Sequence, residues 1–158
     1  MEKMADSLHE RYMRLCLKLA GMARERGEVP VGSVVVRDSA VIAEGIEAVR
    51  AQHDIACHAE TEAIRRACQN LQTLDLSGCT LYSSAEPCFM CYYAIRACRI
   101  STVVFGAPVN TVGGSSSHFP VLSTSAVPDW GPPPKIVQGI LREECEATRN
   151  LPRHSPKP

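Results

Sequence analysis

EPCFMC, residues 86–91, opens a predicted helix near the middle of the chain. Pro87 suits the first turn of a helix, where a backbone N–H is not needed. Three apolar residues continue one face of that helix: Ala94, Ile95 and Cys98. Short apolar runs at 80–83 and 102–105 flank the helix and predict strands. The stretch therefore lies in a strand–helix–strand unit, which is typical of an α/β fold.

The residues before this unit predict a helix, a hairpin and a second helix. Apolar residues spaced three and four apart form the stripe of the first helix, which Gly27 ends: Tyr12, Leu15, Cys16, Leu19, Met22 and Ala23. Two strands at 31–36 and 41–44 are separated by the turn signal Asp38-Ser39. The second helix has its buried face on Ala63, Ile64, Ala67, Cys68 and Leu71. This order of elements predicts a three-layer α/β/α domain, in which helices cover a central mixed sheet.

The chain has 158 residues, a length that suits one domain. We expect its regular pattern, about residues 12–107, to form the core. The pattern then dissolves into a loop rich in glycine, serine and proline, and a loop this long is usually functional or disordered. A last helix is predicted at 140–150. We therefore expect a single domain (1–158) with a loop and C-terminal helix at 108–151 and a frayed tail at 152–158.

Charge and hydropathy argue against a nucleic-acid-binding protein and against a secreted or membrane-spanning one. The chain has 17 Lys plus Arg and 17 Asp plus Glu, so no overall positive charge marks a nucleic-acid binder, although a local basic patch is compatible with this balance. The N-terminus has scattered charges and lacks the apolar segment of a signal peptide. No apolar run approaches the roughly 18 residues of a membrane span. We expect a cytoplasmic protein with no membrane partner.

Two of the eight cysteines are candidate metal ligands. In a reducing compartment cysteines are free thiols or metal ligands rather than disulfides. Six are interpreted as small buried hydrophobic residues: Cys16, Cys57, Cys68, Cys79, Cys98 and Cys145. Cys88 and Cys91 differ, because residues three apart at the start of a helix present both sulfurs on one face. A helix N-terminus also lowers the pKa of a thiol and favours the thiolate that zinc requires.

The stretch CHAE, residues 57–60, supplies a third ligand and a base. Two thiolates and the neutral imidazole of His58 would neutralise Zn²⁺ and fill three tetrahedral positions, which leaves the fourth for water. A structural zinc site would need a fourth protein ligand, and no second pair stands at the usual spacing. Glu60 lies close enough to act as general base. It would take a proton from the attacking water and pass it to a ring nitrogen and then to the departing amine.

The order and spacing of HAE at 58–60 and PCFMC at 87–91 resemble the signature of the cytidine and adenosine deaminase superfamily. Neighbouring stretches are similar to the branch that contains bacterial tRNA adenosine deaminases, guanine deaminases and cytosine deaminases. These stretches are GEVPVG at 27–32 and VVFGA at 103–107. The resemblance covers roughly Tyr12 to Ala107. A lone C-x-x-C is a weak signal, whereas the combined pattern is specific.

This resemblance implies a cytidine-deaminase-like fold and a Zn²⁺ cofactor. It implies three zinc ligands, namely His58, Cys88 and Cys91. Glu60 is then the proton shuttle. The backbone N–H of Ala59 and the backbone carbonyl of Ser84 would line the pocket, with the carbonyl accepting from the amino group under attack. The resemblance also implies a homodimer or larger homo-oligomer, with active sites near the subunit contacts.

The sequence departs from this family at Glu47. Close relatives commonly end the second hairpin strand in Gly-x-Asn, where the Asn side chain binds the base, but this chain reads Gly45-Ile46-Glu47. An amide both donates and accepts hydrogen bonds, whereas an ionised carboxylate only accepts. We therefore interpret Glu47 as a substrate contact of changed polarity. The alternative is that Glu47 is a solvent-facing residue after a strand.

The C-terminal third of the chain also differs from this family. Members that edit transfer RNA tend to carry a basic C-terminal helix, whereas this helix holds Glu143, Glu144 and Glu146, which would repel phosphates. In the proline-rich loop, Trp130 is a candidate to stack on a substrate ring and Asp129 to accept a hydrogen bond from it. The alternative for Trp130 is that it anchors the loop to the core.

We expect an enzyme, a zinc-dependent hydrolytic deaminase of a free nucleobase or a related aminated heterocycle, guanine-like or cytosine-like, that releases ammonia. A nucleic-acid partner is not expected on this interpretation. A second possibility is deamination of tRNA adenosine to inosine. A third, from another class, is a catalytically silent zinc scaffold that binds nucleic acid or protein. The presence of Glu60 argues against a catalytically silent scaffold, because a purely structural metal needs no base beside it.

Overall fold

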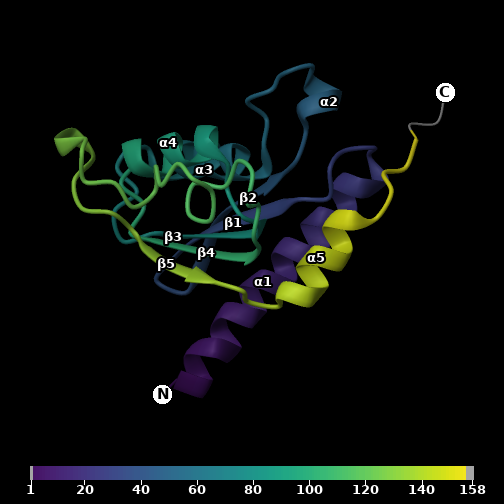
Figure 1. Ribbon diagram of the computed structural model, residues 1–158, viewed down its shortest axis with the longest axis horizontal. Helices are drawn as coiled ribbons and strands as arrows, with labels where there is room; N and C mark the ends of the chain where they lie inside the picture. Colours follow the sequence, from purple (N-terminus) through teal and green to yellow (C-terminus); the bar gives the residue numbers. More distant parts are fainter. Residues whose placement is uncertain (1, 156–158) are drawn as a thin grey trace.

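The computed structural model describes residues 2–155. Five strands form one mixed sheet in the order β2-β1-β3-β4-β5 (Figure 1). The strands are β1 (Gly32–Arg37), β2 (Ala40–Ile46), β3 (Thr80–Ala85), β4 (Thr102–Ala107) and β5 (Lys135–Gln138). β1 pairs antiparallel with β2 and with β3, whereas β3, β4 and β5 run parallel. The predicted mixed sheet is confirmed.

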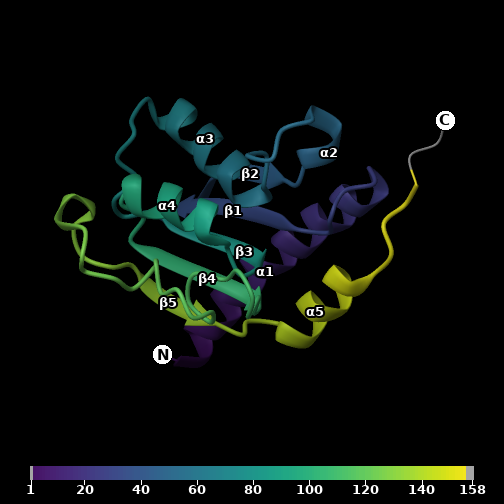
Figure 2. The ribbon, with the colours of Figure 1, turned by 45° about the horizontal axis from the view of Figure 1, so that its top comes forward.

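Helices cover both faces of this sheet, as Figure 2 shows. The helices are α1 (Glu2–Glu25), α2 (Val49–Gln52), α3 (Ala59–Leu71), α4 (Phe89–Ala97) and α5 (Arg142–Asn150). α1 and α5 pack on one face, and α3 and α4 pack on the other. The short α2 lies in the connection between β2 and α3. The three-layer α/β/α arrangement agrees with the prediction.

Alternation along the central strands builds a core on each face of the sheet. Val35 and Leu81 belong to the core under α3 and α4. Their neighbours Val34 and Tyr82 belong to the core under α1 and α5. All four are buried, and full burial of a side chain of this size stabilises a fold by about 1.5–3 kcal/mol. Apolar residues at successive positions therefore predict strands that are covered on both sides.

Two turns form where the sequence signals them. Asp38 and Ser39 join β1 to β2 and have φ angles of 50° and 61°, the left-handed conformation that a two-residue hairpin turn requires. Gly27, with a φ of 81°, follows the end of α1. Short polar residues and glycine adopt this conformation at low cost, which explains why the sequence marks both turns.

Several element bounds differ from the prediction. α1 starts ten residues before Tyr12, because good helix formers extend it where no apolar stripe shows. α4 starts at Phe89, and Cys88, with an extended backbone, is its N-cap in place of Pro87 as the first helical residue. β5 was not predicted, since four residues after a proline-rich stretch carry little alternation. α5 begins at Arg142 because Leu141 is left-handed, with a φ of 50°.

The chain ends in the segment expected to be a frayed tail. Residues 152–155 form no helix or strand, and the carbonyl of Pro152 accepts a hydrogen bond from Arg24 Nε on α1. Residues 156–158 lie outside the described residues. None of the described helices combines the length and the apolar character needed to cross a bilayer.

The sheet brings the two motifs of the sequence together. α4 begins four residues after the end of β3, and Glu60 in the first turn of α3 contacts Ser83 of β3. The N-termini of α3 and α4 therefore meet at the carboxyl end of β3, which is where ligands of such sheets usually bind.

Candidate active site

Three side chains meet between the starts of α3 and α4. His58 is the N-cap of α3, Cys88 is the N-cap of α4, and Cys91 lies in the first turn of α4. The two sulfur atoms are 3.8 Å apart, and His58 Nδ1 lies 3.5 Å from each of them. Within residues 2–155 this is the one group of His, Cys and acidic side chains placed to hold a metal ion together.

The spacing of these atoms fits zinc. Tetrahedral zinc holds sulfur at about 2.3 Å and nitrogen at about 2.0–2.1 Å, so two sulfurs lie about 3.8 Å apart and sulfur and nitrogen about 3.6 Å apart. The sulfur–sulfur distance of 3.8 Å and the two sulfur–nitrogen distances of 3.5 Å in the structure match these values. In the described part of the chain no fourth side chain joins the group. This His/Cys/Cys set is the zinc site of a catalytic rather than a structural metal.

Without a metal the three groups share protons unequally. A hydrogen bond from Cys91 and another from His58 lower the pKa of Cys88 to about 4. The Cys88 thiolate in turn raises the pKa of His58 to about 9. The hydrogen bond to Cys88 and burial raise the pKa of Cys91 far above its usual range. One thiolate is thus already present, and the other two ligands must each lose a proton to bind zinc.

Glu60 lies beside the metal ligands. Its Oε1 accepts a hydrogen bond of 3.0 Å from Ser83 Oγ, and its Oε2 lies 3.6 Å from Cys91 Sγ. The side chain is buried, and burial raises the pKa of its carboxyl. A raised pKa makes a carboxylate a stronger base, which suits a group that must take up a proton.

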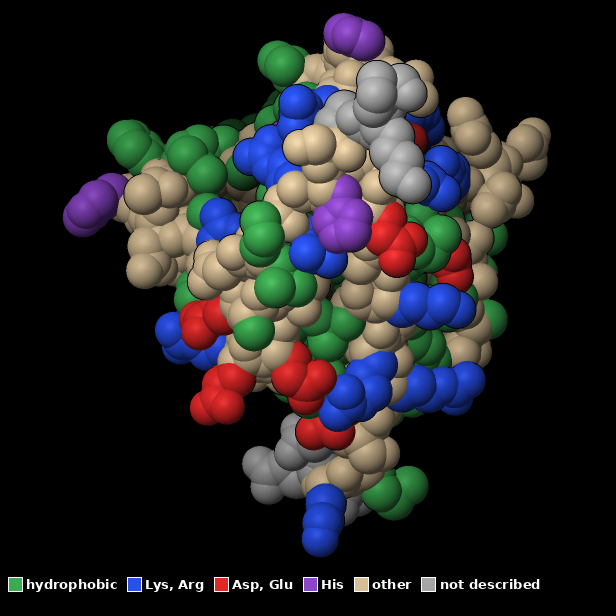
Figure 3. Space-filling view, turned by 90° about the vertical axis from the view of Figure 1, so that its right-hand side faces the viewer, with side chains coloured by type: hydrophobic (Ala, Val, Ile, Leu, Met, Phe, Trp, Pro, Cys, Tyr) green, Lys and Arg blue, Asp and Glu red, His purple; other side chains and the backbone are tan. Residues whose placement is uncertain are grey.

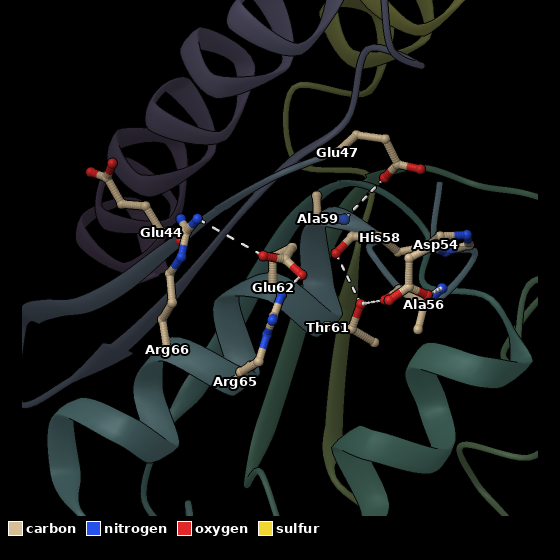
Figure 4. Close-up of polar contacts among 10 residues, drawn as sticks. All are labelled: Glu44, Glu47, Asp54, Ala56, His58, Ala59, Thr61, Glu62, Arg65 and Arg66. Atoms are coloured by element: carbon tan, nitrogen blue, oxygen red, sulfur yellow. Dashed lines mark hydrogen bonds and ion pairs between the residues drawn. The ribbon is translucent and has the colours of Figure 1, made fainter. Parts of the chain in front are cut away.

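Glu47 lies across the start of α3 from these groups. It follows β2 directly, is 6% exposed, and accepts a hydrogen bond of 2.9 Å at Oε2 from the N–H of Ala59 (Figure 4). Burial, and then the charge of Glu60, raise the pKa of Glu47 to about 7. The solvent-facing alternative for Glu47 is therefore not the arrangement in the structure. The N–H of Ala59, which the resemblance gives to the substrate, is held by this carboxylate.

A pocket of about 190 Å³ opens onto the metal ligands. Its apolar walls are Val29, Val31, Ala85, Val109 and Val112. Its polar groups are Glu47, His58, Glu60, Glu86, Cys88 and Arg149. The pocket is smaller than the roughly 300–1,000 Å³ that drug-sized ligands occupy, so a single ring system suits it.

Glu86 was missed in the sequence, although it directly precedes the Pro-Cys motif. Its buried carboxylate accepts hydrogen bonds from the N–H groups of Val109, Ser115 and Ser116 at 2.8–2.9 Å. A side chain on Gly113 would overlap this carboxylate, so only glycine lets the loop approach. Glu86 therefore fixes the loop segment whose valines wall the pocket.

Arg96 orders the rest of that loop and was also missed. Its guanidinium is buried and donates to the carbonyls of Leu122 and Thr124, at 2.7 and 2.8 Å. It lies 5.1 Å from the centre of the Trp130 ring, and Tyr93 contacts the edge of the same ring. Trp130 thus has the anchoring position that the sequence left open as its alternative role.

Two of the predicted substrate contacts, Asp129 and Trp130, do not line this pocket. Asp129 is exposed. Ser84 is buried in β3, where its hydroxyl accepts a hydrogen bond of 3.2 Å from the N–H of Gly32. Its side chain therefore holds two strands together.

The C-terminal helix is acidic only at its start. Glu144 pairs with Arg14 of α1 at 3.0 Å, and Glu146 pairs with Arg142 at 2.8 Å. The last turn of α5 instead brings Arg149 to the pocket. The expected repulsion of phosphates by this helix is thus weakened, because two of its three acidic side chains are paired and its pocket end is cationic.

The chain is similar to known proteins in sequence and in structure. The model of the cytidine and deoxycytidylate deaminase zinc-binding region matches residues 6–107. A tRNA-specific adenosine deaminase of Aquifex aeolicus is 41% identical over 113 residues, which are 72% of this chain and 75% of the relative. A tRNA-specific adenosine deaminase of Haemophilus influenzae is 37% identical over 144 residues, which are 90% of this chain and 82% of the relative.

Two solved structures are similar over different shares of the chain. One comes from studies of A-to-I editing by tRNA:A34 deaminases. It has a TM-score of 0.81 and 36% identity, and the match covers 87% of this chain and 98% of that one. The other is guanine deaminase from Bacillus subtilis, with a TM-score of 0.60 and 41% identity over 63% of this chain and 64% of that one.

Proposed function

Because the chain belongs to the cytidine and deoxycytidylate deaminase zinc-binding family and is a zinc-dependent deaminase, we propose that it converts an adenosine of a tRNA to inosine. The extent of the sequence similarity carries this proposal, since a tRNA-specific relative aligns with 90% of the chain. The free-base substrate favoured by the sequence becomes the second candidate. A tRNA substrate also suits the cytoplasmic location expected from the sequence.

The reaction exchanges the amino group at a ring carbon for oxygen. Water adds to the carbon, the carbon–nitrogen bond breaks, and ammonia leaves. The ligands for zinc would be His58, Cys88 and Cys91. Zinc in a three-ligand site acts as a Lewis acid that makes water nucleophilic at neutral pH.

Glu60 moves the protons of this reaction. Ser83 holds Oε1, so Oε2, the oxygen beside Cys91, is the one that faces the reacting atoms. Glu60 takes a first proton from the attacking water and delivers it to the ring nitrogen, and then carries the proton of the newly added hydroxyl to the departing amine, which leaves as ammonia. One carboxylate serves both steps because the incoming oxygen and the leaving nitrogen are bonded to the same carbon.

The surface beside the pocket supports a polyanionic substrate. Arg149 lines the pocket and has no ion-pair partner among the described residues. Figure 3 shows Lys and Arg side chains interspersed with Asp and Glu side chains over one face of the molecule. Cationic side chains around a pocket attract a phosphate backbone although the net charge of the chain is zero.

A free nucleobase or a related aminated heterocycle is the second candidate. The pocket volume of about 190 Å³ favours one ring system without a large substituent. The likeness to a guanine deaminase also supports this class. Guanine-like and cytosine-like rings both carry an amino group on a carbon bonded to a ring nitrogen, as the reaction requires.

The test compares both substrate classes with one zinc-loaded preparation. Inosine formation is measured in an anticodon stem–loop RNA, and ammonia release is measured with free purines and pyrimidines. We expect inosine with the natural chain and a loss of about 100-fold or more with Glu60→Gln. Ammonia from a free base together with no inosine would overturn the tRNA assignment in favour of the second candidate.

We also propose that the protein is a homodimer. Two large apolar side chains support this, since Tyr93 on α4 is 61% exposed and Phe119 in the loop between β4 and β5 is 64% exposed. Exposed apolar side chains that lie on adjoining segments often mark protein contacts. Light scattering should give twice the chain mass, and a mass of one chain at micromolar concentration would refute the dimer.

A further inference from the structure

We propose that a polar hollow beside the active-site pocket binds a phosphate group of the RNA next to the target adenosine. The hollow has a volume of about 500 Å³, and Arg26, Arg65 and Arg66 line it. This proposal rests on the tRNA substrate proposed above and adds to it a contact for the RNA backbone. None of these three side chains lines the pocket at the metal ligands, so their role is separate from the deamination reaction.

The hollow and the pocket lie on opposite sides of the same stretches of chain. Ile46 and Ala48 line the hollow, whereas Glu47, the residue between them, lines the pocket. Cys57 lines the hollow, and the next residue, His58, lines the pocket. One layer of chain therefore separates the two. An RNA strand that places one nucleotide in the pocket can thus carry a neighbouring phosphate to the hollow.

Positive charge exceeds negative charge around the hollow. Arg26 follows the end of α1, and Arg65 and Arg66 are exposed residues of α3. Two carboxylates, those of Asp54 and Glu62, also line the hollow. Three guanidinium groups beside two carboxylates give the hollow an excess of positive charge, although the chain as a whole is neutral.

Both carboxylates of the hollow already have partners. Glu62 is buried and forms ion pairs with Arg65 and, at 3.9 Å, with Arg66 (Figure 4). Asp54 Oδ1 accepts a hydrogen bond of 2.8 Å from the backbone N–H two residues later. Arg26 has no ion-pair partner in the part of the chain that the structure describes. Arg26 is therefore the cation that an incoming anion would neutralise.

Contacts around α3 fix the other two guanidinium groups. Nη1 of Arg66 donates to the carbonyl of Glu44 at 2.8 Å, and its Nη2 faces Glu62. Arg65 is held by the same carboxylate. Ion pairs between exposed residues of one helix add little to stability. Their effect here is to orient two planar guanidinium groups at the hollow, and such groups bind phosphate oxygens through paired N–H donors.

A contact with a phosphate holds the RNA strand without reading its sequence. Arginines that neutralise phosphates release counterions, so such a contact makes RNA affinity depend on salt. Contacts to the backbone set the position of a nucleic acid, whereas contacts to the bases set its specificity. The hollow would thus position the strand, and the pocket would select the base.

The experiment measures binding of an anticodon stem–loop RNA to the zinc-loaded protein with Glu60→Gln, which prevents turnover. Arg26→Gln and Arg66→Gln each remove one charge and leave the closer ion pair of Glu62 intact. We expect each substitution to weaken RNA binding about fivefold or more. The slope of log affinity against log salt should become shallower by about 0.7–0.9. Arg37→Gln, exposed at the other end of β1, is the matched control and should change neither.

Neutral methylphosphonate linkages identify the phosphate that occupies the hollow. One linkage near the target adenosine is replaced at a time, which removes its charge and keeps the strand continuous. We expect one position at which replacement weakens binding about fivefold with both arginines present and has little effect once Arg26→Gln and Arg66→Gln are combined. If no position behaves in this way, the inference is wrong.

The outcomes separate this inference from the proposed function. Inosine formation by the natural chain, with RNA affinity and salt slope unchanged in Arg26→Gln and Arg66→Gln, would overturn the role of the hollow alone. An equal loss of affinity with Arg37→Gln would assign the effect to overall charge and would also overturn it. Absence of both inosine formation and RNA binding with the natural chain would overturn the tRNA assignment itself. Because the Arg26 side chain is exposed, Arg26→Gln should keep the zinc content and melting temperature of the natural chain.

Discussion

The sulfur atoms of Cys88 and Cys91 lie 3.8 Å apart, which is the distance between two sulfur ligands on one tetrahedral zinc ion. They are the N-cap and a first-turn residue of the same helix, so the start of α4 sets their spacing. His58 reaches them from the start of α3. A metal ion at this point therefore ties together the two helices that cover one face of the sheet.

Substitution of either sulfur ligand should remove both metal and stability. We expect Cys88→Ala and Cys91→Ala to lose zinc and to unfold at lower temperature, because a ligand present at a thousand times its Kd stabilises a fold by about 4 kcal/mol. Metal analysis and thermal melts measure the two effects. Cys98→Ala, at the other end of α4, serves as control and should keep its zinc. One equivalent of zinc in both ligand variants would disprove the ligand set.

Substitution of Glu60 should separate metal binding from catalysis. Glu60→Gln keeps the shape of the side chain and its contact with Ser83 but cannot carry the proton. We expect full zinc content and a fall in kcat of about 100-fold or more. Turnover near that of the natural chain would assign the proton transfer to another group.

Zinc binding should release about two protons per chain near pH 7. In the metal-free protein Cys88, with a pKa of about 4, has already lost its proton. His58, with a pKa of about 9, and Cys91, whose pKa is raised further, still hold theirs. Because zinc binds neutral imidazole and thiolate, one proton leaves each of these two residues.

Because protons leave when zinc binds, zinc affinity should increase with pH. Zinc affinity should rise by about 100-fold per pH unit from pH 6 toward the pKa of His58 and more gently above it. Calorimetric titration in buffers of different ionisation enthalpy measures the number of protons. A release near zero at pH 7 would mean that both thiolates and a neutral His58 exist before the metal arrives.

Arg96 should be essential for the order of the loop between β4 and β5. Arg96→Met leaves the buried carbonyls of Leu122 and Thr124 without their donor, and each such group costs about 1–3 kcal/mol. We expect a loss of about 3 kcal/mol in urea unfolding and faster proteolysis within residues 121–131. Arg99→Met, an exposed neighbour, is the matched control. Unfolding equal to that of the natural chain would mean that the loop is held by other contacts.

The sequence predicted most of the sheet and the metal group because their signals are local. The spacing of Cys88 and Cys91 within one helical turn and the alternation in β1, β3 and β4 are visible in short windows. Elements with little internal pattern were missed or misplaced, as β5 and the first ten residues of α1 show.

The remaining pocket residues depend on contacts across long stretches of chain. The residues around Glu86 give no sign that it binds a loop some 25 residues later in the chain. The residues around Arg149 likewise do not indicate that the last turn of α5 lies at the pocket. For Trp130 the sequence left two roles open, substrate stacking and anchoring of the loop, and in the structure a buried arginine on α4 contacts its ring.

The position of Arg149 in the pocket wall also bears on the order in which the protein becomes functional during synthesis. All three metal ligands have left the ribosome once residue 91 is clear of it, and β4 follows by residue 107. The pocket gains its last wall residue only when the second half of α5 emerges. The chain thus completes its set of metal ligands well before it completes the wall of the pocket.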